Sequence, residues 1–172
     1  MSLLYLVSHL CTMQPVIIFH SYSGVTRGIA NAVMTACGGD LIEVTPKERY
    51  SKMSAYTLGC YRALREESEP IDPECIDVAS YDLMVIGTPV WAWKATPAIN
   101  AAILALKNCE GRKAVIFATC GAQAKDTLLI MRRSLEARGV LVVGEVVLTK
   151  KEIEVGTKIQ DLISCVSSAM VR

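Results

Sequence analysis

The chain of 172 residues lacks several features that would point to particular functions. Its only histidines are His9 and His20, and no two of its seven cysteines form a Cys-x-x-Cys pair, so no zinc-binding pattern can be assembled. The formal net charge is only +1 and no tract of lysine and arginine occurs, which argues against nucleic acids and anionic membranes as partners. The apolar string at residues 3–7 is too short to span a bilayer, and no basic residue precedes it as in a signal peptide. We therefore expect a cytoplasmic protein with no nucleic-acid and no membrane partner.

The composition gives little sign of disorder or of several domains. Hydrophobic residues make up 52% of the chain, which is enough for one substantial core. The cysteines are scattered, as is typical of reduced and mostly buried thiols in a cytosolic protein. We expect residues 1–14 to be an N-terminal extension and residues 15–172 to form one domain.

Short apolar runs alternate with helical patterns along the chain. Gly144, inside the last apolar run, suggests a β-bulge. The alternation gives five βα units and favours an α/β domain with a parallel sheet. For a sheet of order 2-1-3-4-5, ligands bind beyond the carboxyl ends of strands 1 and 3, where the strand order reverses. Strands are predicted at 16–19, 40–45, 81–87, 113–118 and 140–148, and helices at 26–37, 97–106, 126–138 and around 159–166.

The turn after the first strand has the composition of a phosphate site. Ser21-Tyr22-Ser23-Gly24-Val25-Thr26 follows Val16–Phe19 and precedes a helix. Such a turn directs backbone N–H groups, hydroxyls and the positive end of a helix dipole to one point. It is neither a Walker A loop nor a Gly-x-Gly-x-x-Gly loop, and its serine and threonine also occur as ordinary helix caps. Gly24 lets the backbone approach a ligand closely, and Arg27 either assists or faces solvent.

Two further loops lie where a ligand is expected. Residues 88–96 follow the third strand and contain both tryptophans, Trp91 and Trp93. An indole provides the flat apolar wall that a planar aromatic cofactor needs, although either ring could instead cover the edge of the sheet. Residues 119–125 follow the fourth strand and contain Cys120, whose thiol either fits as a small apolar group, the favoured interpretation, or takes part in redox chemistry.

Together these loops resemble those of the flavodoxin family. The Ser-Gly-x-Thr turn is similar to the family's phosphate loop, the run 81–93 to its Tyr-Asp…Ile-Gly-Thr-Pro-x-Trp segment, and the run 117–121 to its next flavin loop. The resemblance implies a flavodoxin-like three-layer sandwich with a five-stranded parallel sheet of order 2-1-3-4-5, and non-covalently bound FMN as cofactor. No catalytic side chain and no metal ligand is expected. The residues implied to bind FMN are Ser21, Tyr22, Ser23, Gly24, Val25, Thr26, Thr88, Pro89, Val90, Trp91, Trp93, Thr119, Cys120 and Gly121.

The chain departs from electron-carrying flavodoxins in three respects. It is neutral where such carriers are acidic, Ala92-Trp93 stands where a flexible glycine is usual, and Gly121-Ala-Gln-Ala has no stacking tyrosine. We therefore favour a flavin-dependent oxidoreductase that receives electrons from NAD(P)H or from a redox partner protein. The alternatives are a flavodoxin-type electron carrier and a non-catalytic binding domain, and a homodimer is left open.

The segment 46–73 is longer than a plain connection requires. Within it, Ser54–Leu64 is predicted to form a short helix. Its tyrosines, Tyr50, Tyr56 and Tyr61, either cover the cofactor or a dimer partner as a lid, or pack on the sheet.

Overall fold

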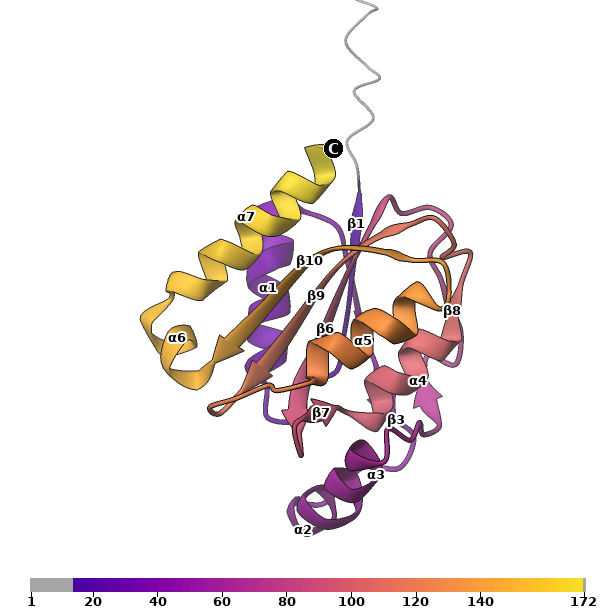
Figure 1. Ribbon diagram of the computed structural model, residues 1–172, viewed down its shortest axis with the longest axis vertical. Coiled ribbons are helices and arrows are strands. Elements are labelled where there is room, and N and C mark those ends of the chain that lie inside the picture. Colours follow the sequence, from indigo (N-terminus) through magenta and orange to yellow (C-terminus); the bar gives the residue numbers. More distant parts are fainter. Residues whose placement is uncertain (1–13, 172) are drawn as a thin grey trace, which may run out of the picture.

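A five-stranded parallel sheet forms the centre of the computed structural model, which describes residues 14–171 (Figure 1). In space the strands run β10-β9-β6-β1-β2, so the predicted order 2-1-3-4-5 is confirmed. The inner strands are buried on both faces, as their continuous apolar runs predict. The strands are β1 (Pro15–Phe19), β2 (Asp40–Glu43), β6 (Leu83–Trp91), β9 (Lys113–Cys120) and β10 (Leu141–Thr149).

Helices cover both faces of this sheet (Figure 1). On one face α1 (Val25–Cys37) and α7 (Thr157–Val171) pack side by side over a core that includes Phe19 and Phe117. On the other face α4 (Pro97–Ala105) and α5 (Thr127–Glu136) cover a second apolar core. The predicted three-layer sandwich is thus confirmed.

Two glycines within the strands allow close packing that a side chain would prevent. A Cβ on Gly87 of β6 would lie 2.2 Å from the ring of Phe117 on the neighbouring strand. A Cβ on Gly144 of β10 would lie 2.3 Å from the sulfur of Cys165 on α7. The register between β10 and β9 shifts between Val142 and Gly144, which confirms the predicted bulge.

Two elements differ from the sequence prediction at the carboxyl end of the sheet. Residues 88–91, predicted as loop, continue β6 and pair with β7 (Lys94–Ala95) in a hairpin. Residues 150–155 form a separate helix, α6 (Lys150–Val155), that the sequence pattern did not predict. A capping box explains its start, because the Thr149 side chain accepts from the Glu152 N–H and the Glu152 carboxylate accepts from the Thr149 N–H.

The long connection after β2, residues 45–72, lies beyond the carboxyl end of the sheet, and we call it the excursion. Its short helices form a separate tip of the molecule (Figure 1). Its entry strand β3 (Thr45–Pro46) pairs antiparallel with its exit strand β4 (Ile71–Asp72). Between them the chain is helical in three short stretches, which agrees with the predicted helix at 54–64. These are α2 (Lys52–Ser54), the π-helix η1 (Ala55–Gly59) and α3 (Cys60–Leu64).

A second short pair, β5 (Ile76–Asp77) and β8 (Leu106–Lys107), joins the exit of the excursion to the end of α4. Within residues 14–171, no helix combines the length and the hydropathy needed to cross a bilayer. The N-terminal extension expected at residues 1–14 lies, except for Gln14, outside the described part of the chain.

Candidate functional site

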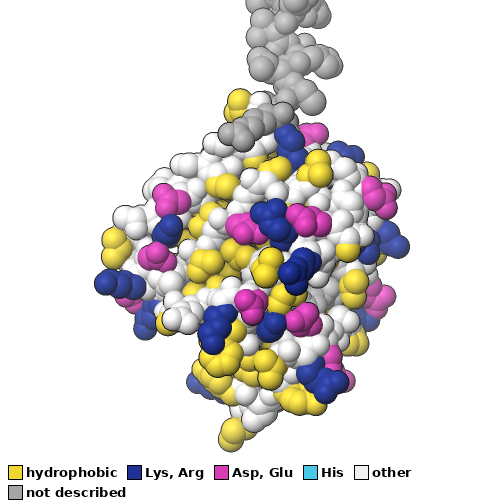
Figure 2. Space-filling model, viewed as in Figure 1, with side chains coloured by type: hydrophobic (Ala, Val, Ile, Leu, Met, Phe, Trp, Pro, Cys, Tyr) yellow, Lys and Arg dark blue, Asp and Glu magenta, His cyan; other side chains and the backbone are white. Residues whose placement is uncertain are grey.

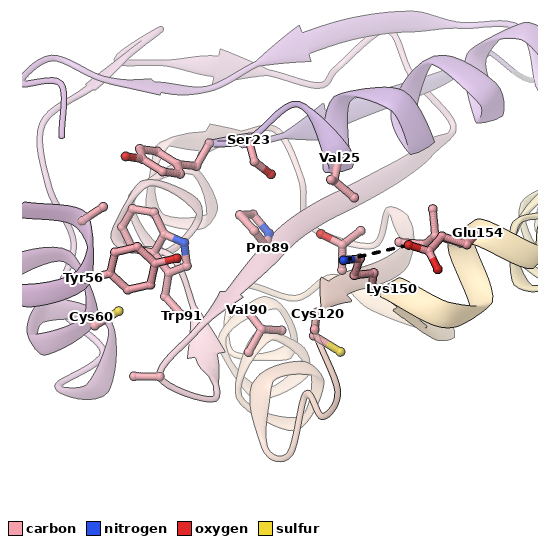
Figure 3. A pocket seen from close by; sticks show the side chains of 16 residues that line it. Ser23, Val25, Tyr56, Cys60, Pro89, Val90, Trp91, Cys120, Lys150 and Glu154 are labelled. Atoms are coloured by element: carbon pink, nitrogen blue, oxygen red, sulfur yellow. Dashed lines mark ion pairs between the residues drawn. The ribbon is translucent and has the colours of Figure 1, made fainter. Parts of the chain in front are cut away.

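A pocket of about 610 Å³ opens at the carboxyl ends of β6 and β9, beside the N-terminus of α1 (Figure 3). Its size is within the range of small-molecule and cofactor sites. The three loops that the strand order singled out all contribute to it. Its lining residues are Tyr22, Ser23, Val25, Ala55, Tyr56, Cys60, Pro89, Val90, Trp91, Ala92, Thr119, Cys120, Gly121, Lys150, Ile153 and Glu154.

The first wall is the turn that begins α1. Gly24 precedes the helix with φ = 91°, a left-handed conformation that glycine adopts at little cost. The helical hydrogen bonds start with the Gly28 N–H donating to the Gly24 carbonyl (3.0 Å), so the N–H groups before it lie outside the helical ladder. Ser21 is buried and its hydroxyl accepts from the Arg27 N–H at 3.1 Å. The turn is therefore shaped to present N–H groups and the Ser23 hydroxyl to an anion.

A buried hydrogen bond joins this turn to the end of β9. The hydroxyls of Thr26 and Thr119 lie 2.8 Å apart, and both side chains are buried. Thr119, Cys120 and Gly121 line the pocket, whereas Thr26, Ser21 and Gly24 do not. Three of the six predicted phosphate-loop residues are thus outside the lining, and two of these, Ser21 and Thr26, are buried and hydrogen-bonded.

Trp91, at the end of β6, is held among three other rings. Its ring centroid lies 5.6 Å from that of Tyr22, 5.5 Å from Tyr50 and 6.2 Å from His20, each edge to face. A Cβ on Gly59 of η1 would lie 2.5 Å from the indole, so the excursion packs directly against it. With Pro89 and Val90 beside it, Trp91 forms an apolar wall of the pocket.

The structure does not bring Trp93 to this pocket. Ala92 and Trp93 form the two-residue turn of the β6–β7 hairpin, with φ of 48° and 63°. Ala92 faces the pocket, while the ring of Trp93 packs beneath the ammonium group of Lys125 at 3.9 Å.

Thr88 also lies outside the lining, for a different reason. It is fully buried, and its hydroxyl oxygen accepts from the N–H of Thr96, the residue that precedes α4. Thr88 thereby fixes the start of α4 behind the pocket wall.

Three titratable groups beside the pocket, His20, Cys60 and Cys120, have pKa values shifted toward their neutral forms. His20 donates from Nδ1 to the Val44 carbonyl at 2.9 Å, and burial lowers the pKa of its imidazole. Burial raises the pKa of the Cys120 thiol, and the nearby Glu152 carboxylate adds to this. Burial likewise raises the pKa of the Cys60 thiol, against a hydrogen bond with the Ala92 backbone. Protonated thiols favour the interpretation of Cys120 as a small apolar contact.

Sequence reasoning missed two walls of the pocket. The excursion contributes Ala55, Tyr56 and Cys60, of which only Tyr56 had been considered for a lid. Helix α6 contributes Lys150 and Glu154, together with Ile153. The Thr-x-x-Glu sequence at 149–152 is a signal that could have located α6. Across residues 14–171, no three His, Cys, Asp or Glu side chains are grouped as a metal site would require.

Comparisons with known proteins agree with this geometry. A family model described as flavodoxin matches residues 14–137. No curated protein sequence matches the chain. Among solved structures, a proposed flavoprotein from Bacteroides eggerthii DSM 20697 has a TM-score of 0.74 at 20% identity, covering 93% of this chain and 99% of its own.

Two further solved structures carry informative descriptions. A flavoprotein in complex with FMN from Lactobacillus acidophilus NCFM has a TM-score of 0.68 at 20% identity, covering 83% of this chain and 97% of its own. An NADH:FMN oxidoreductase, in its apo form, has a TM-score of 0.62 at 16% identity, covering 92% of this chain and 89% of its own. At these identities the likenesses show the fold alone.

Proposed function

Because the chain belongs to the flavodoxin family, we propose that its pocket binds FMN and that the protein is a flavin-dependent oxidoreductase. One observation carries the proposal. The N-terminus of α1, the indole of Trp91 and the end of β9 converge on one pocket of cofactor size. A phosphate, a planar ring and a polar ring edge are the three parts of FMN that these walls suit.

The residues present fit the cofactor part by part. The left-handed Gly24 opens the turn so that N–H groups and the Ser23 hydroxyl can bind the phosphate. Pro89, Val90 and Trp91 supply the apolar wall for the ring system, and Gly121 leaves open space, since a Cβ there would meet no atom within 4 Å. When bound, FMN supplies the capacity to accept and donate electrons.

The protein's own contribution is to bind, orient and exclude water. The mutual packing of Tyr22, Trp91 and Tyr50 fixes the indole before any ligand arrives. Tyr56, on the excursion, reaches the pocket although 79% of the residue is exposed, so it covers the wall without being held rigidly. Because the His20 imidazole beside Trp91 is neutral, it adds no positive charge to the apolar wall that Trp91 forms.

Two properties favour an oxidoreductase over an electron carrier. The net charge of +1 gives little electrostatic steering toward a charged partner protein. The pocket also has a wall outside the sandwich, made by Ala55, Tyr56 and Cys60, which a substrate or nicotinamide could contact. The electron carrier stays the second candidate, because exposed Met53, Tyr56 and Tyr61 form an apolar tip that a partner could contact (Figure 2).

Binding is tested by titrating the purified apo protein with FMN and following flavin fluorescence. Ser23→Asp places a carboxylate against the phosphate and is expected to abolish binding, whereas Ser23→Ala removes only one hydroxyl and should weaken it by less than about tenfold. Retention of tight FMN binding by Ser23→Asp would contradict the assignment of the turn.

The function is tested by anaerobic titration of the FMN-loaded protein with NADH, NADPH and reduced ferredoxin, read as bleaching of the flavin absorbance. Rapid reduction by a nicotinamide supports the oxidoreductase. Reduction by ferredoxin alone, with no turnover of an acceptor, would favour the electron carrier.

A further inference from the structure

Helix α6 places a positively charged side chain at the pocket, whereas the lining residues from the turn before α1 carry no charge. Lys150 and Glu154 both line the pocket, and Figure 3 places them toward the same end as Val25, away from Tyr56 and Trp91. Lys150 is the only lysine or arginine among the lining residues, and Glu154 is the only acid.

The basic residue nearest the turn, Arg27, is already paired with a carboxylate outside the pocket. Arg27 lies in the first turn of α1, but it does not line the pocket. Its guanidinium donates to the carboxylate of Glu43 on β2 twice, from Nε at 2.9 Å and from Nη2 at 2.5 Å. Such a bidentate pair largely neutralises the arginine and fixes its direction.

Lys150, by contrast, is anchored at its backbone and exposed at its tip. The capping box between Thr149 and Glu152 fixes the first turn of α6. The Lys150 side chain is 78% exposed, and its Nζ is 4.0 Å from the Glu154 carboxylate, the outer limit of an ion pair. A pair this exposed and this long holds a lysine weakly, so the ammonium group can turn toward an anion in the pocket.

We propose that Lys150 neutralises the phosphate of the bound flavin and thereby selects FMN over flavins without a phosphate. This inference rests on the proposed FMN binding. A phosphate monoester carries a charge of about −1.5 to −2 at neutral pH. N–H groups and hydroxyls of the turn can bind its oxygens but bring no full charge, which only Lys150 supplies from within the lining.

Dissociation constants for FMN and for riboflavin, measured by flavin fluorescence, test the proposal in three chains. These are the parent, Lys150→Gln, and the control Lys151→Gln, which alters the exposed neighbour outside the lining. Lys150→Gln is expected to weaken FMN about fivefold and to leave riboflavin within about twofold. Lys151→Gln should change neither constant, and raising the salt concentration should shrink the difference between parent and Lys150→Gln.

Glu154→Gln is expected to change the affinity for FMN in the opposite direction. Removing the carboxylate frees Lys150 from its partner and removes a like charge from the phosphate, so FMN should bind more tightly and riboflavin should not. Circular dichroism and melting temperature confirm that each variant keeps the parent fold.

Several results would overturn the proposal. An equal loss for FMN and riboflavin in Lys150→Gln would make the residue a structural one, and an unchanged FMN constant would remove its role. A phosphate-selective loss in Arg27→Gln but not in Lys150→Gln would transfer the role to Arg27. If the parent bound neither flavin, the proposed function would fail together with the inference, whereas FMN binding that ignores Lys150 would overturn the inference alone.

Discussion

At the scale of single residues, the turn of Ala92 and Trp93 stores conformational strain beside the pocket. Both residues have positive φ, which two-residue hairpins require and which asparagine and glycine tolerate best. At Trp93, the contact of the ring with Lys125, on the loop after β9, offsets part of this strain. Ala92 lines the pocket, and its backbone forms a hydrogen bond with the Cys60 thiol.

Ala92→Asn is therefore expected to stabilise the ligand-free protein. Relief of part of the left-handed strain should raise the free energy of unfolding by about 0.5–1 kcal/mol, or the melting temperature by about 1–4 °C. The same replacement at Ala36, an exposed position within α1, should instead lower stability slightly because asparagine is a poorer helix former. Equal changes at the two sites, by thermal unfolding, would show that the turn is not strained.

His20 makes stability depend on pH with a defined sign. Burial holds its folded-state pKa below the ordinary value of 6.5, so between the two values the unfolded chain binds more protons. Its contribution is fully present above about pH 6.5 and is lost as the pH falls through the lowered folded-state pKa. Urea unfolding at pH 5 to 8 should show this loss in the parent and in His9→Gln, and a flatter profile in His20→Gln. A profile that His20→Gln leaves unchanged would assign the pH dependence to other groups.

At the scale of elements, the contact between η1 and β6 decides how the excursion meets the sandwich. Gly59→Ala would place a methyl group 2.5 Å from the indole of Trp91, so either the ring or the helix must shift. We expect a loss of about 1–3 kcal/mol in stability and weaker FMN binding. Gly28→Ala is the matched control, since a Cβ there meets nothing within 4 Å and alanine should stabilise α1 by up to about 1 kcal/mol. An unaffected flavin affinity in Gly59→Ala would show that this contact does not shape the pocket.

The excursion is also expected to close on the cofactor. Ala55, Tyr56 and Cys60 line the pocket, yet Met53 and Tyr56 are 78% and 79% exposed, a combination typical of a weakly held segment. Hydrogen exchange followed by mass spectrometry should show slower exchange of residues 47–65 when FMN binds, while α5, which contributes no residue to the pocket lining, stays unchanged. No added protection of residues 47–65 would exclude a lid.

At the scale of the whole molecule, the sheet and its order follow from local patterns. Continuous apolar runs such as Val16–Phe19 identify strands buried on both faces, and the strand order then brings the three polar loops to one edge. Nine of the lining residues belong to the set that sequence reasoning assigned to the cofactor.

What the sequence left undetermined depends on tertiary contacts. Whether Trp91 or Trp93 faces the pocket depends on the hairpin with β7 and on Lys125, neither of which has a local signal. The burial of Thr26 and Thr88 depends on partners far along the chain, Thr119 and Thr96. The wall from the excursion includes a π-helix and the wall from α6 is a six-residue α-helix, both too short for periodicity to predict.

The pairing of β3 with β4 gives the excursion the properties of an interchangeable module. Its ends meet side by side, with the Lys47 N–H donating to the Pro70 carbonyl at 2.9 Å, so the chain leaves and rejoins the sandwich at adjacent points. Between these points the excursion also contacts the sandwich, at Trp91 through Gly59 and at Lys94 through Glu66. Inside, Tyr50 donates to the Glu69 carboxylate, and the segment carries polar contacts of its own. Evolution or an engineer could exchange these roughly two dozen residues for a tight turn or for another helix pair without altering the sheet, since loops whose ends are close tolerate replacement. One fold could in this way change what it admits to the pocket while keeping the walls that bind the phosphate.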